Sequence, residues 1–406
     1  MARKVSIILV GAGGYGNIYL GEMLKKIGDE RFSIAGIVDP APQGCRYLAE
    51  LKELGVPFFS TIEEFYAENT ADLAVISSPI HFHQYHSCYA MTRGSNVLCE
   101  KPVSATVQEA LIMADARDKT GKFLAVGYQW SFNDAILGLK RDIIAGRFGK
   151  PLRLKTIVLW PRDARYFSRK WAAKIKDEHG NWVLDSIAAN ATAHYLHNMF
   201  FVMGEKEDES IYPKEVMAEL YRANNIENFD TAAARIITEN GTEMMFYASH
   251  AVNESIGPVL YYEFEKGMVS LTHGMDNNSL VARFNDGTIV NYGNPFDKEM
   301  EKLWVCIDAA AGLDASIPSS VESAISHVVC VNGMQESVPG IAGFPESLIR
   351  KDADRQVTWV EGLKEVMLEC YEDWILPSEK EIPWAKAGEK INLIGYRHFG
   401  GCFGKI

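Results

Sequence analysis

The chain has 406 residues, 47% of them hydrophobic and 23% charged, which is too long for one typical hydrophobic core, so two domains are expected. Its formal net charge of −12, without any run rich in lysine and arginine, argues against binding to nucleic acid or to an anionic membrane surface. The seven cysteines are scattered without a C-x-x-C pair, which is typical of reduced thiols in a cytoplasmic protein and not of a disulfide framework or a zinc site. No apolar run reaches the roughly 18 residues of a membrane span.

Strand and helix patterns alternate over the first 126 residues. The opening run, residues 5–10, is almost wholly apolar and β-branched, as expected of a parallel strand buried on both faces. The alternation predicts an α/β fold with a doubly wound parallel sheet, that is, a Rossmann domain over residues 1–126. The expected strands are residues 5–10, 32–38, 73–76, 97–99 and 123–127, and the expected helices are residues 17–27, 43–54, 61–65, 83–93 and 106–120.

A glycine-rich turn follows the first strand. In Gly11-x-Gly13-x-x-Gly16, the first glycine permits a tight turn, the second lets a pyrophosphate approach the backbone, and the third lets helix and strand pack closely. The phosphates would lie on the free amides at the start of the next helix. Asp39 ends the second strand, where a carboxylate can accept hydrogen bonds from an adenosine ribose and repel a 2′-phosphate. The pattern predicts a dinucleotide site that takes NAD in preference to NADP; FAD and S-adenosylmethionine are alternative ligands of such a loop.

Residues 127–406 show a different pattern. Strands follow one another across turn pairs such as Asn240-Gly241 and Asp286-Gly287, which are typical of an antiparallel meander. We expect an α+β domain for substrate binding and oligomerisation, with an open, mainly antiparallel sheet and C-terminal helices that could pack back on the first domain. An open sheet needs a cover on its second face, and apolar residues alternate within residues 248–252, so we expect a homodimer or homotetramer. The expected strands are residues 152–160, 231–238, 243–249, 259–265, 268–272, 280–284 and 288–291, and the expected helices are residues 134–145, 187–203, 298–311, 320–336 and 361–374.

Two polar clusters stand where strands of the first domain end, which is where open α/β sheets bind ligands. One is Ser78-Pro79 with the histidines that follow, and the other is Glu100-Lys101-Pro102. The amine of Lys101 would start near the nicotinamide if the cofactor is NAD(P). Alcohol oxidation needs a hydride acceptor and a group that takes the hydroxyl proton, and a lysine held between a cofactor and a second domain can take it. The alternative is a surface lysine in a loop.

Four polar residues surround the helix expected after Trp182: Asp185, Asn190, His194 and His197. Asn190 and His194 are four residues apart, so a continuous helix places them on one face, with His197 close to that face. Two histidines without a nearby carboxylate are a weak metal signal, and we expect no metal site. Asp185 is alternatively an N-cap, with Ser186 as the rival candidate.

A segment of mixed aromatic and basic residues follows the first long strand of the second domain. Its planar rings can stack on a ligand, and its cationic groups can bind hydroxyls or carboxylates, so the composition suits a polyhydroxylated or acidic small molecule. A solvated loop packed at the domain joint is the alternative. The candidate substrate-binding residues here are Trp160, Arg162, Arg165, Tyr166, Trp171 and Lys174.

Over most of its length the chain resembles the glucose–fructose oxidoreductase / inositol dehydrogenase / MocA (Gfo/Idh/MocA) group of NAD(P)-dependent enzymes. The resemblance implies that Lys101 contacts both the nicotinamide and the reacting hydroxyl, and that its peptide bond to proline is often cis. The motifs that carry it are the glycine turn, Asp39-Pro40, the turn from Pro79 to His83, Glu100-Lys101-Pro102, Gly127-Tyr128-Gln129-Trp130 and Gly146-Arg147-Phe148-Gly149. The implied cofactor contacts are Gly11, Gly13, Gly14, Tyr15, Gly16, Asp39, Ser78, Pro79, His83, Glu100, Lys101 and Gln129.

The family's second-domain helix usually reads D-x-G-x-H-x-x-D, with its histidine in proton transfer. That histidine matches His194, whereas Asn190 and His197 stand in place of the two aspartates. The resemblance implies catalytic roles for Lys101, His194 and Asn190, with Asp185 or Lys101 supplying what Asn190 cannot, and substrate contacts from Lys101, Asn190, His194 and His197. It implies NAD(P)-dependent oxidation of a secondary hydroxyl of a sugar, polyol or sugar acid, and the cysteine usage predicts a cytoplasmic location. A hydrolase or epimerase that retains its NAD, and a cofactor-sensing regulator, stay open as alternatives.

Overall fold

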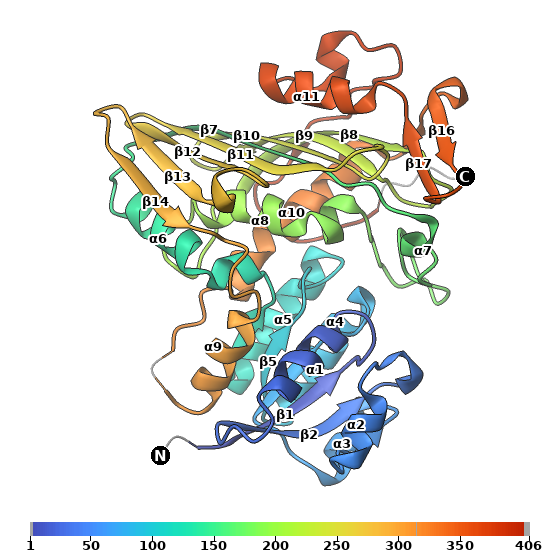
Figure 1. The fold of residues 1–406 in the computed structure, drawn as a ribbon, viewed down its shortest axis with the longest axis vertical. Coiled ribbons are helices and arrows are strands. Elements are labelled where there is room, and N and C mark those ends of the chain that lie inside the picture. The colour runs from blue at the N-terminus through green and yellow to red at the C-terminus, as the bar shows by residue number, and fades with distance from the viewer. Residues whose placement is uncertain (1–2, 314, 402–406) are drawn as a thin grey trace. The chain divides into compact units, whose positions relative to one another are not determined.

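The computed structural model describes residues 3–313 and 315–401, and the chain divides into two compact units (Figure 1). The first unit comprises Met1–Ser104, Gln108–Phe132 and Lys298–Ile325, and the second comprises Ala105–Val107, Asn133–Asp297 and Ser326–Ile406. Residues 298–325, which the sequence pattern placed in the second domain, are therefore part of the first unit. Within the part of the chain that the structure describes, no helix is long and apolar enough to cross a membrane.

The first unit is built on a six-stranded sheet in the order β3-β2-β1-β4-β5-β6, and every neighbouring pair is parallel. The doubly wound parallel sheet predicted from the sequence is confirmed. The chain order reverses between β1 and β4, and ligands of such sheets bind in the crevice outside the strand ends at this point. The strands are β1 (Val5–Val10), β2 (Phe32–Val38), β3 (Phe58–Phe59), β4 (Leu73–Ile76), β5 (Asn96–Cys99) and β6 (Leu124–Val126), and the helices are α1 (Gly16–Lys25), α2 (Leu48–Glu53), α3 (Ile62–Glu68), α4 (His83–Thr92), α5 (Val107–Thr120) and α9 (Glu301–Ala310).

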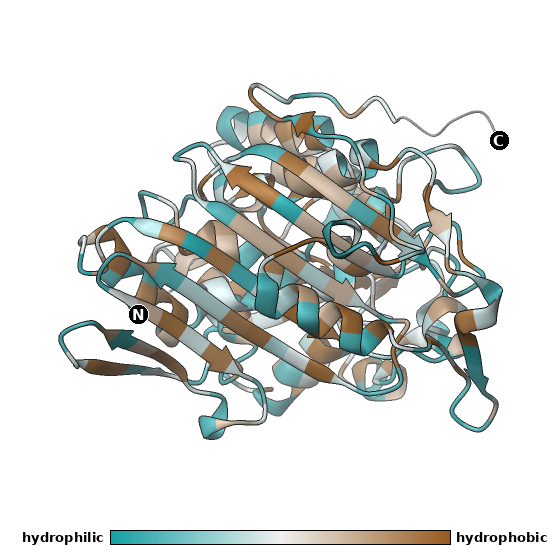
Figure 2. Ribbon diagram, turned by 90° about the horizontal axis from the view of Figure 1, so that it is seen from above, coloured by the Kyte–Doolittle hydropathy of each residue, from teal (hydrophilic) through white to brown (hydrophobic). Residues whose placement is uncertain are grey.

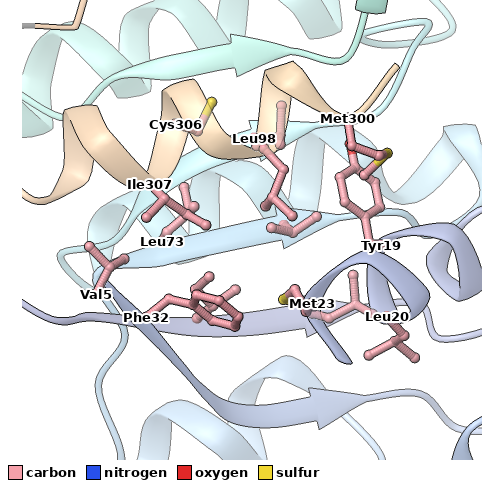
Figure 3. Close-up of a cluster of buried hydrophobic side chains, with 14 of the residues drawn as sticks. Val5, Tyr19, Leu20, Met23, Phe32, Leu73, Leu98, Met300, Cys306 and Ile307 are labelled. Atoms are coloured by element: carbon pink, nitrogen blue, oxygen red, sulfur yellow. The ribbon is translucent and has the colours of Figure 1, made fainter. Parts of the chain in front are cut away.

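One face of this sheet packs on α1 and α9. Alternate residues of β1 point to this face, so Val5 joins a fully buried cluster that also holds Leu20 of α1. Leu303 and Ile307 of α9 lie in the same cluster and have no exposed surface, as Figure 3 shows for Ile307 beside Leu73 and Leu98. A fully buried aliphatic side chain contributes roughly 1.5–3 kcal/mol, so α9 is part of this unit's core although it comes late in the sequence.

The second unit is built on a larger, mostly antiparallel sheet in the order β14-β13-β12-β11-β7-β10-β9-β8-β15. The predicted α+β class and mainly antiparallel sheet are confirmed. The strands are β7 (Pro151–Leu159), β8 (Pro213–Arg222), β9 (Thr231–Thr238), β10 (Glu243–Ser249), β11 (Ile256–Phe264), β12 (Gly267–Thr272), β13 (Leu280–Phe284), β14 (Ile289–Gly293) and β15 (Ala342–Gly343), with β18 (Ile391–Asn392) beside β8 and a separate pair, β16 (Ile349–Asp352) and β17 (Val357–Val360). The helices are α6 (Asp134–Ile144), α7 (Ala164–Phe167), α8 (Ala193–Phe201) and α11 (Leu363–Asp373); α10 (Val321–Ser337) begins in the first unit and continues into the second.

The central pair of this sheet, β7 and β10, is parallel, and Leu159 lies opposite Ser249 in its register. A plain antiparallel meander would place the ends of consecutive strands at opposite edges. Here the carboxyl ends of β7 and β10 meet at one edge, so Trp160 and His250, the residues that follow them, are neighbours.

The chain's own C-terminal segment covers one face of this sheet. Leu363 and Met367 of α11 pack against Ile157 and Tyr247 in one buried cluster, and Figure 2 looks onto this face with α11 lying across the strands. Residues 251 and 252 belong to the same cluster. The apolar alternation in residues 248–252, from which we inferred oligomerisation, is therefore explained by packing within a single chain.

The helix predicted over residues 187–203 is interrupted near its start. Ser186, not Asp185, caps a π-helical turn (Ile187–Ala191) by accepting a hydrogen bond from Ala189 N at 3.1 Å, and α8 begins only at Ala193. The backbone N–H and the hydroxyl of Thr192 both donate to Ile187 O, at 3.0 and 2.7 Å, which stabilises the wide turn. A π turn contains an extra residue, so the four-residue spacing between Asn190 and His194 does not fix a common face.

Candidate active site

The glycine turn between β1 and α1 has the space and the backbone geometry that a dinucleotide requires. Gly11 has φ +91°, and a Cβ there would lie 2.7 Å from the carbonyl carbon of Ser77. A Cβ on Gly16 would lie 2.0 Å from Gly11 O, whereas a Cβ on Gly13 would meet no atom nearer than Gly44 O at 4.0 Å. No side chain caps α1, so no side-chain oxygen occupies the start of this helix. The residues fit a pyrophosphate at this helix end.

Asp39 ties the end of β2 to the glycine turn. Its Oδ2 accepts a hydrogen bond from Ala12 N at 2.8 Å, and its Oδ1 accepts one from Ala41 N at 2.8 Å. A carboxylate can accept about four hydrogen bonds, so these two contacts leave capacity for ribose hydroxyls. The same charge opposes a 2′-phosphate, which agrees with the predicted preference for NAD.

A buried ion pair lies directly behind Lys101. Glu100 Oε1 accepts hydrogen bonds from the Tyr19 hydroxyl at 2.6 Å and from Lys302 Nζ at 2.5 Å, and Lys302 Nζ also donates to Gly127 O at 3.2 Å. The other carboxylate oxygen, Oε2, accepts from the backbone N–H of Lys101 at 3.2 Å. Lys302 has no exposed surface, and Glu100 is 5% exposed.

This arrangement gives Glu100 a structural role, and its cofactor contact stays a prediction. Burial alone would raise the pKa of Glu100, but Lys302 and the hydrogen bond from Tyr19 hold it below its ordinary value, so the group is an internal carboxylate ion. Its contacts fix the backbone at Lys101, whose peptide bond to Pro102 is cis, as the resemblance implied. Lys302 was not among the predicted site residues, because it lies 202 positions after Glu100 in the sequence, on α9.

His83 clamps the ends of β4 and β5 together. Its Nε2 lies 2.8 Å from Ser78 O and its Nδ1 lies 2.8 Å from Pro102 O, while the Ser78 hydroxyl contacts His86 Nδ1 at 2.9 Å. His83 is 1% exposed and holds the two strand ends in position, and its cofactor contact stays a prediction. Pro79 precedes a short 3₁₀ turn in the same loop.

Tyr15 links the glycine turn to two other segments of the first unit. Its hydroxyl donates to Glu299 Oε1 at 3.1 Å and to Gln129 Oε1 at 3.4 Å, and Lys302 Nζ lies 4.4 Å from its ring centre. Burial raises the pKa of Tyr15, so the phenol stays neutral. Gly14, with φ +48° and no atom within 4 Å of an added Cβ, leaves this side of the turn open.

In the second unit, Asp185 holds Asn190. The carboxylate is 2% exposed; its Oδ1 accepts from Asn190 Nδ2 at 2.9 Å, and its Oδ2 accepts from Ala173 N at 2.6 Å. Asp185 therefore orients the amide of Asn190 at the π turn. His194 opens α8 just beyond it and is half-buried.

The aromatic and basic segment after β7 forms a layered cluster. The Arg162 guanidinium carbon lies 5.6 Å from the centre of the Trp160 ring and 5.1 Å from that of Tyr166, and the Arg169 carbon lies 4.2 Å from Tyr166 and 4.6 Å from Trp171. Burial raises the pKa of Tyr166, as does the nearby charge of Asp185. The structure thus brings four of the predicted substrate residues together and adds Arg169, which the sequence analysis did not name.

His250 joins this cluster from the end of β10. Its Nδ1 lies 2.8 Å from Trp160 O, and its ring centre lies 5.3 Å from that of Tyr166. The parallel pairing of β7 with β10 places it there, and the sequence pattern of consecutive strands did not indicate that pairing.

Three predicted substrate residues lie apart from the cluster or point elsewhere. Arg165 is exposed and pairs with Asp163 at 3.3 Å, and Lys174 pairs with Glu227. His197 is fully buried and stacks on Phe201 at 5.6 Å between ring centres, which is a core position and does not support the predicted substrate contact.

Residues 5–128 match the model of an oxidoreductase family, GFO_IDH_MocA, described by its NAD-binding Rossmann fold. The match covers the N-terminal part of the chain, and the family assignment concerns these residues. The Gfo/Idh/MocA domain covers the glycine turn, Asp39 and Lys101, so these residues stand in an NAD-binding fold.

Curated relatives are similar to the chain over part of their length. A 1-carboxy-3-chloro-3,4-dihydroxycyclohexa-1,5-diene dehydrogenase of Comamonas testosteroni is 28% identical over 35% of this chain and 35% of its own. Inositol 2-dehydrogenase 1 of Saccharopolyspora erythraea is 29% identical over 39% of this chain and 48% of its own. The chain thus spans less than half the length of each of these relatives.

The WlbA dehydrogenase of Bordetella pertussis, solved in complex with NADH and UDP-GlcNAcA, has a similar fold. It superposes with a TM-score of 0.68 over 83% of this chain and 98% of its own, at 21% identity. At that identity the likeness concerns the fold. The likeness in fold therefore extends beyond the residues that the family model matches.

Proposed function

We propose that the protein is an NAD-dependent dehydrogenase that oxidises a secondary hydroxyl of a sugar, polyol or sugar acid. The observation that carries the proposal is the placement of Lys101: it follows β5 at the ligand-binding edge of an NAD-binding sheet, on backbone held by the buried Glu100–Lys302 pair. The names of the relatives, an inositol dehydrogenase and a dihydroxy-ring dehydrogenase, support a cyclic polyhydroxylated substrate.

The reaction removes two hydrogens from a carbinol. Bound NAD⁺ supplies the acceptor for the hydride that leaves carbon, and the O–H proton goes to a base of the protein as the C–O bond becomes a carbonyl. Lys101, as a neutral amine, or His194 takes that proton. In the reverse direction the same group, protonated, returns it to the alkoxide oxygen.

Asn190 cannot take up the proton, because an amide is not a base in water. Its hydrogen bond to Asp185 fixes which way the amide faces, and we propose that it orients the substrate hydroxyl. This assignment separates a positioning pair, Asp185 and Asn190, from the proton acceptors Lys101 and His194.

The test begins with a panel of polyols, sugars and sugar acids scanned for NAD⁺ reduction at 340 nm. On the substrate found, Lys101→Ala should lose roughly 100-fold or more in kcat, as expected for a general acid–base group worth about 10²–10⁴. The Kd for NADH should change less than about threefold, because phosphates and ribose are held by the glycine turn and Asp39. Lys101→Arg should fail almost as badly, since a guanidinium does not give up its proton near neutral pH.

The matched control is Lys52→Ala, which removes an exposed lysine of the same unit. It should keep wild-type kcat and NADH affinity. Near-wild-type turnover by Lys101→Ala would contradict the proposed role of Lys101 and would mean that the residue has only a structural role at the end of β5.

A further inference from the structure

The cluster after β7 contains a cation that the structure leaves without a counter-charge. Among residues 3–313 and 315–401, no carboxylate lies within ion-pair distance of Arg162, and its buried Nε has no hydrogen-bond acceptor. The nearby carboxylate of Asp163 is engaged by Arg165 at 3.3 Å and by Tyr166 N at 3.0 Å. The rings of Trp160 and Tyr166 hold the guanidinium at 5.6 and 5.1 Å, so its position is set without an ion pair.

His250, in the same cluster as Arg162, presents a hydrogen-bond acceptor, whereas Arg162 presents only donors. Because Trp160 O can only accept, the nitrogen 2.8 Å from it, Nδ1, carries the proton. Burial lowers the pKa of His250 to about 3, and the charges of Arg162 and Arg169 act in the same direction, so the ring is neutral and Nε2 is an acceptor. Nε2 is buried and has no donor among the described residues, and the whole residue is 1% exposed.

A buried polar atom without a partner costs about 1–3 kcal/mol, so two such atoms in one cluster indicate an absent ligand or an ordered water. The Arg162 guanidinium and the His250 ring lie 5.1 and 5.3 Å from the centre of the same Tyr166 ring. The two groups therefore lie within about 10 Å of each other, a distance that one sugar acid can bridge when a hydrogen bond is added at each end. A ligand that satisfies both atoms carries an anionic oxygen for Arg162 and a hydroxyl donor for His250.

We propose that Arg162 and His250 form a subsite for a sugar acid, in which Arg162 binds the carboxylate and His250 Nε2 accepts a hydrogen bond from a hydroxyl of the same molecule. The inference rests on the proposed dehydrogenase function and narrows its substrate class from sugars and polyols in general to their carboxylic acids. Arg162 and His250 determine specificity; neither takes part in the hydride or proton transfer.

The experiment compares matched neutral and acidic substrates: D-glucitol with D-gluconate, D-glucose with D-glucuronate, and D-galactose with D-galacturonate. The wild type should oxidise the acid of at least one pair with a kcat/KM about tenfold or more above its neutral partner. Arg162→Gln should lower kcat/KM for the acid by about 10- to 100-fold, the range expected for a hydrogen bond between charged groups, and change that for the neutral partner less than about threefold.

His250→Asn keeps a donor for Trp160 O but removes the Nε2 acceptor. It should lower kcat/KM for the acid about tenfold, and the double variant should lose less than the product of the two single losses, because both groups hold one ligand. Lys170→Gln, an exposed charge of the same segment, is the control and should match the wild type. Each variant's NADH affinity and Tm report folding; if His250→Asn does not fold, Arg162→Gln decides alone.

The failures are distinguishable. If the wild type oxidises the neutral partners as well as the acids, or Arg162→Gln lowers both equally, the subsite is wrong and the dehydrogenase function stands. If folded His250→Asn loses less than twofold in kcat/KM for the acid, only a water contacts Nε2, and the proposed role of His250 in the subsite is overturned. If no compound of the panel is oxidised and none shifts the Tm of the NADH-bound protein, both the proposed function and the sugar-acid subsite are rejected.

Discussion

Replacing Lys302 with methionine should destabilise the first unit by about 3–5 kcal/mol at pH 7.5, the cost of removing one partner of a buried ion pair. Nζ lies 2.5 Å from Glu100 Oε1 and has no exposed surface. Methionine has a similar length and volume, so the variant removes the donor to Gly127 O and the charge that lies 4.4 and 5.1 Å from the ring centres of Tyr15 and Tyr19. In a domain of this size, about 2–4 °C in Tm corresponds to each kcal/mol, so its Tm should fall by roughly 6–20 °C.

The penalty should depend on pH in a defined direction. In the wild type the pKa of Glu100 is held below its ordinary value, so the pair's stabilisation is present above the unfolded pKa of about 4.3 and is lost as the pH falls through the folded pKa. Without Lys302, burial raises that pKa above the unfolded value, and the variant then loses stability as the pH rises from about 4.3. Each pH unit in that window is worth up to about 1.4 kcal/mol, so the difference from wild type should shrink between pH 7.5 and pH 5 by up to about 3 kcal/mol.

Thermal unfolding of both proteins at pH 7.5 and pH 5 measures this, with Trp304 on α9 as the fluorescent reporter of the first unit. Glu100→Gln combined with Lys302→Met removes both charges and should recover more than half of the lost stability. The control is Lys25→Met, which removes an exposed pair with Glu22 at 3.7 Å and should stay within about 0.5 kcal/mol of wild type. A Lys302→Met shift below 2 °C, or one equal at both pH values, would refute the reasoning.

Two further predictions concern the cofactor and the oligomer. Asp39→Asn should reduce the preference for NADH over NADPH at least about tenfold in fluorescence titrations at low salt, because the charge that opposes a 2′-phosphate is gone. An unchanged ratio would reject this role of Asp39, and the control is Asp29→Asn, which removes a half-buried carboxylate paired with Arg31 in the same unit. The homodimer or homotetramer stays a prediction: light scattering at micromolar concentration should give a mass above that of the monomer, and a monomer mass would contradict it.

The Rossmann unit was largely predictable because its information is local. The strand of residues 5–10 is apolar throughout, glycines end it, and β1 begins and ends where the pattern said it would. The positions of Gly11 and Gly16 follow from backbone geometry that only glycine permits, so their identities alone carry the prediction. The role of Lys302 could not be predicted in this way, because nothing in the sequence of an amphipathic helix indicates that a lysine amine will be buried against a residue 202 positions earlier.

The second unit was predicted by class but not by topology. Turn pairs identify antiparallel neighbours, yet nothing local indicates that β7 inserts between β10 and β11 or that β10 lies parallel to it. The sequence pattern therefore indicated only that His250 stands within an apolar alternation. Its position beside Trp160 follows from the parallel pairing of β7 with β10. The π turn had a similar cause, because the helix propensity of residues 187–203 does not report that Thr192 bonds back to Ile187.

The Lys302 variants also bear on how Lys101 is positioned. Glu100 Oε2 accepts a hydrogen bond from the backbone N–H of Lys101, and Glu100 Oε1 accepts from Lys302 and Tyr19. A change in the ion pair that moves the Glu100 carboxylate therefore also moves the backbone of Lys101, the proposed base. The double variant Glu100→Gln/Lys302→Met, if it recovers stability, separates the two effects. It should bind NADH with wild-type affinity, because Asp39 and the glycine turn are untouched, and yet lose roughly tenfold in kcat, because misplacement of a catalytic group raises the barrier without weakening cofactor binding. Full recovery of kcat together with stability would mean that the ion pair supports the fold alone and that Lys101 is placed by its strand and by Pro102.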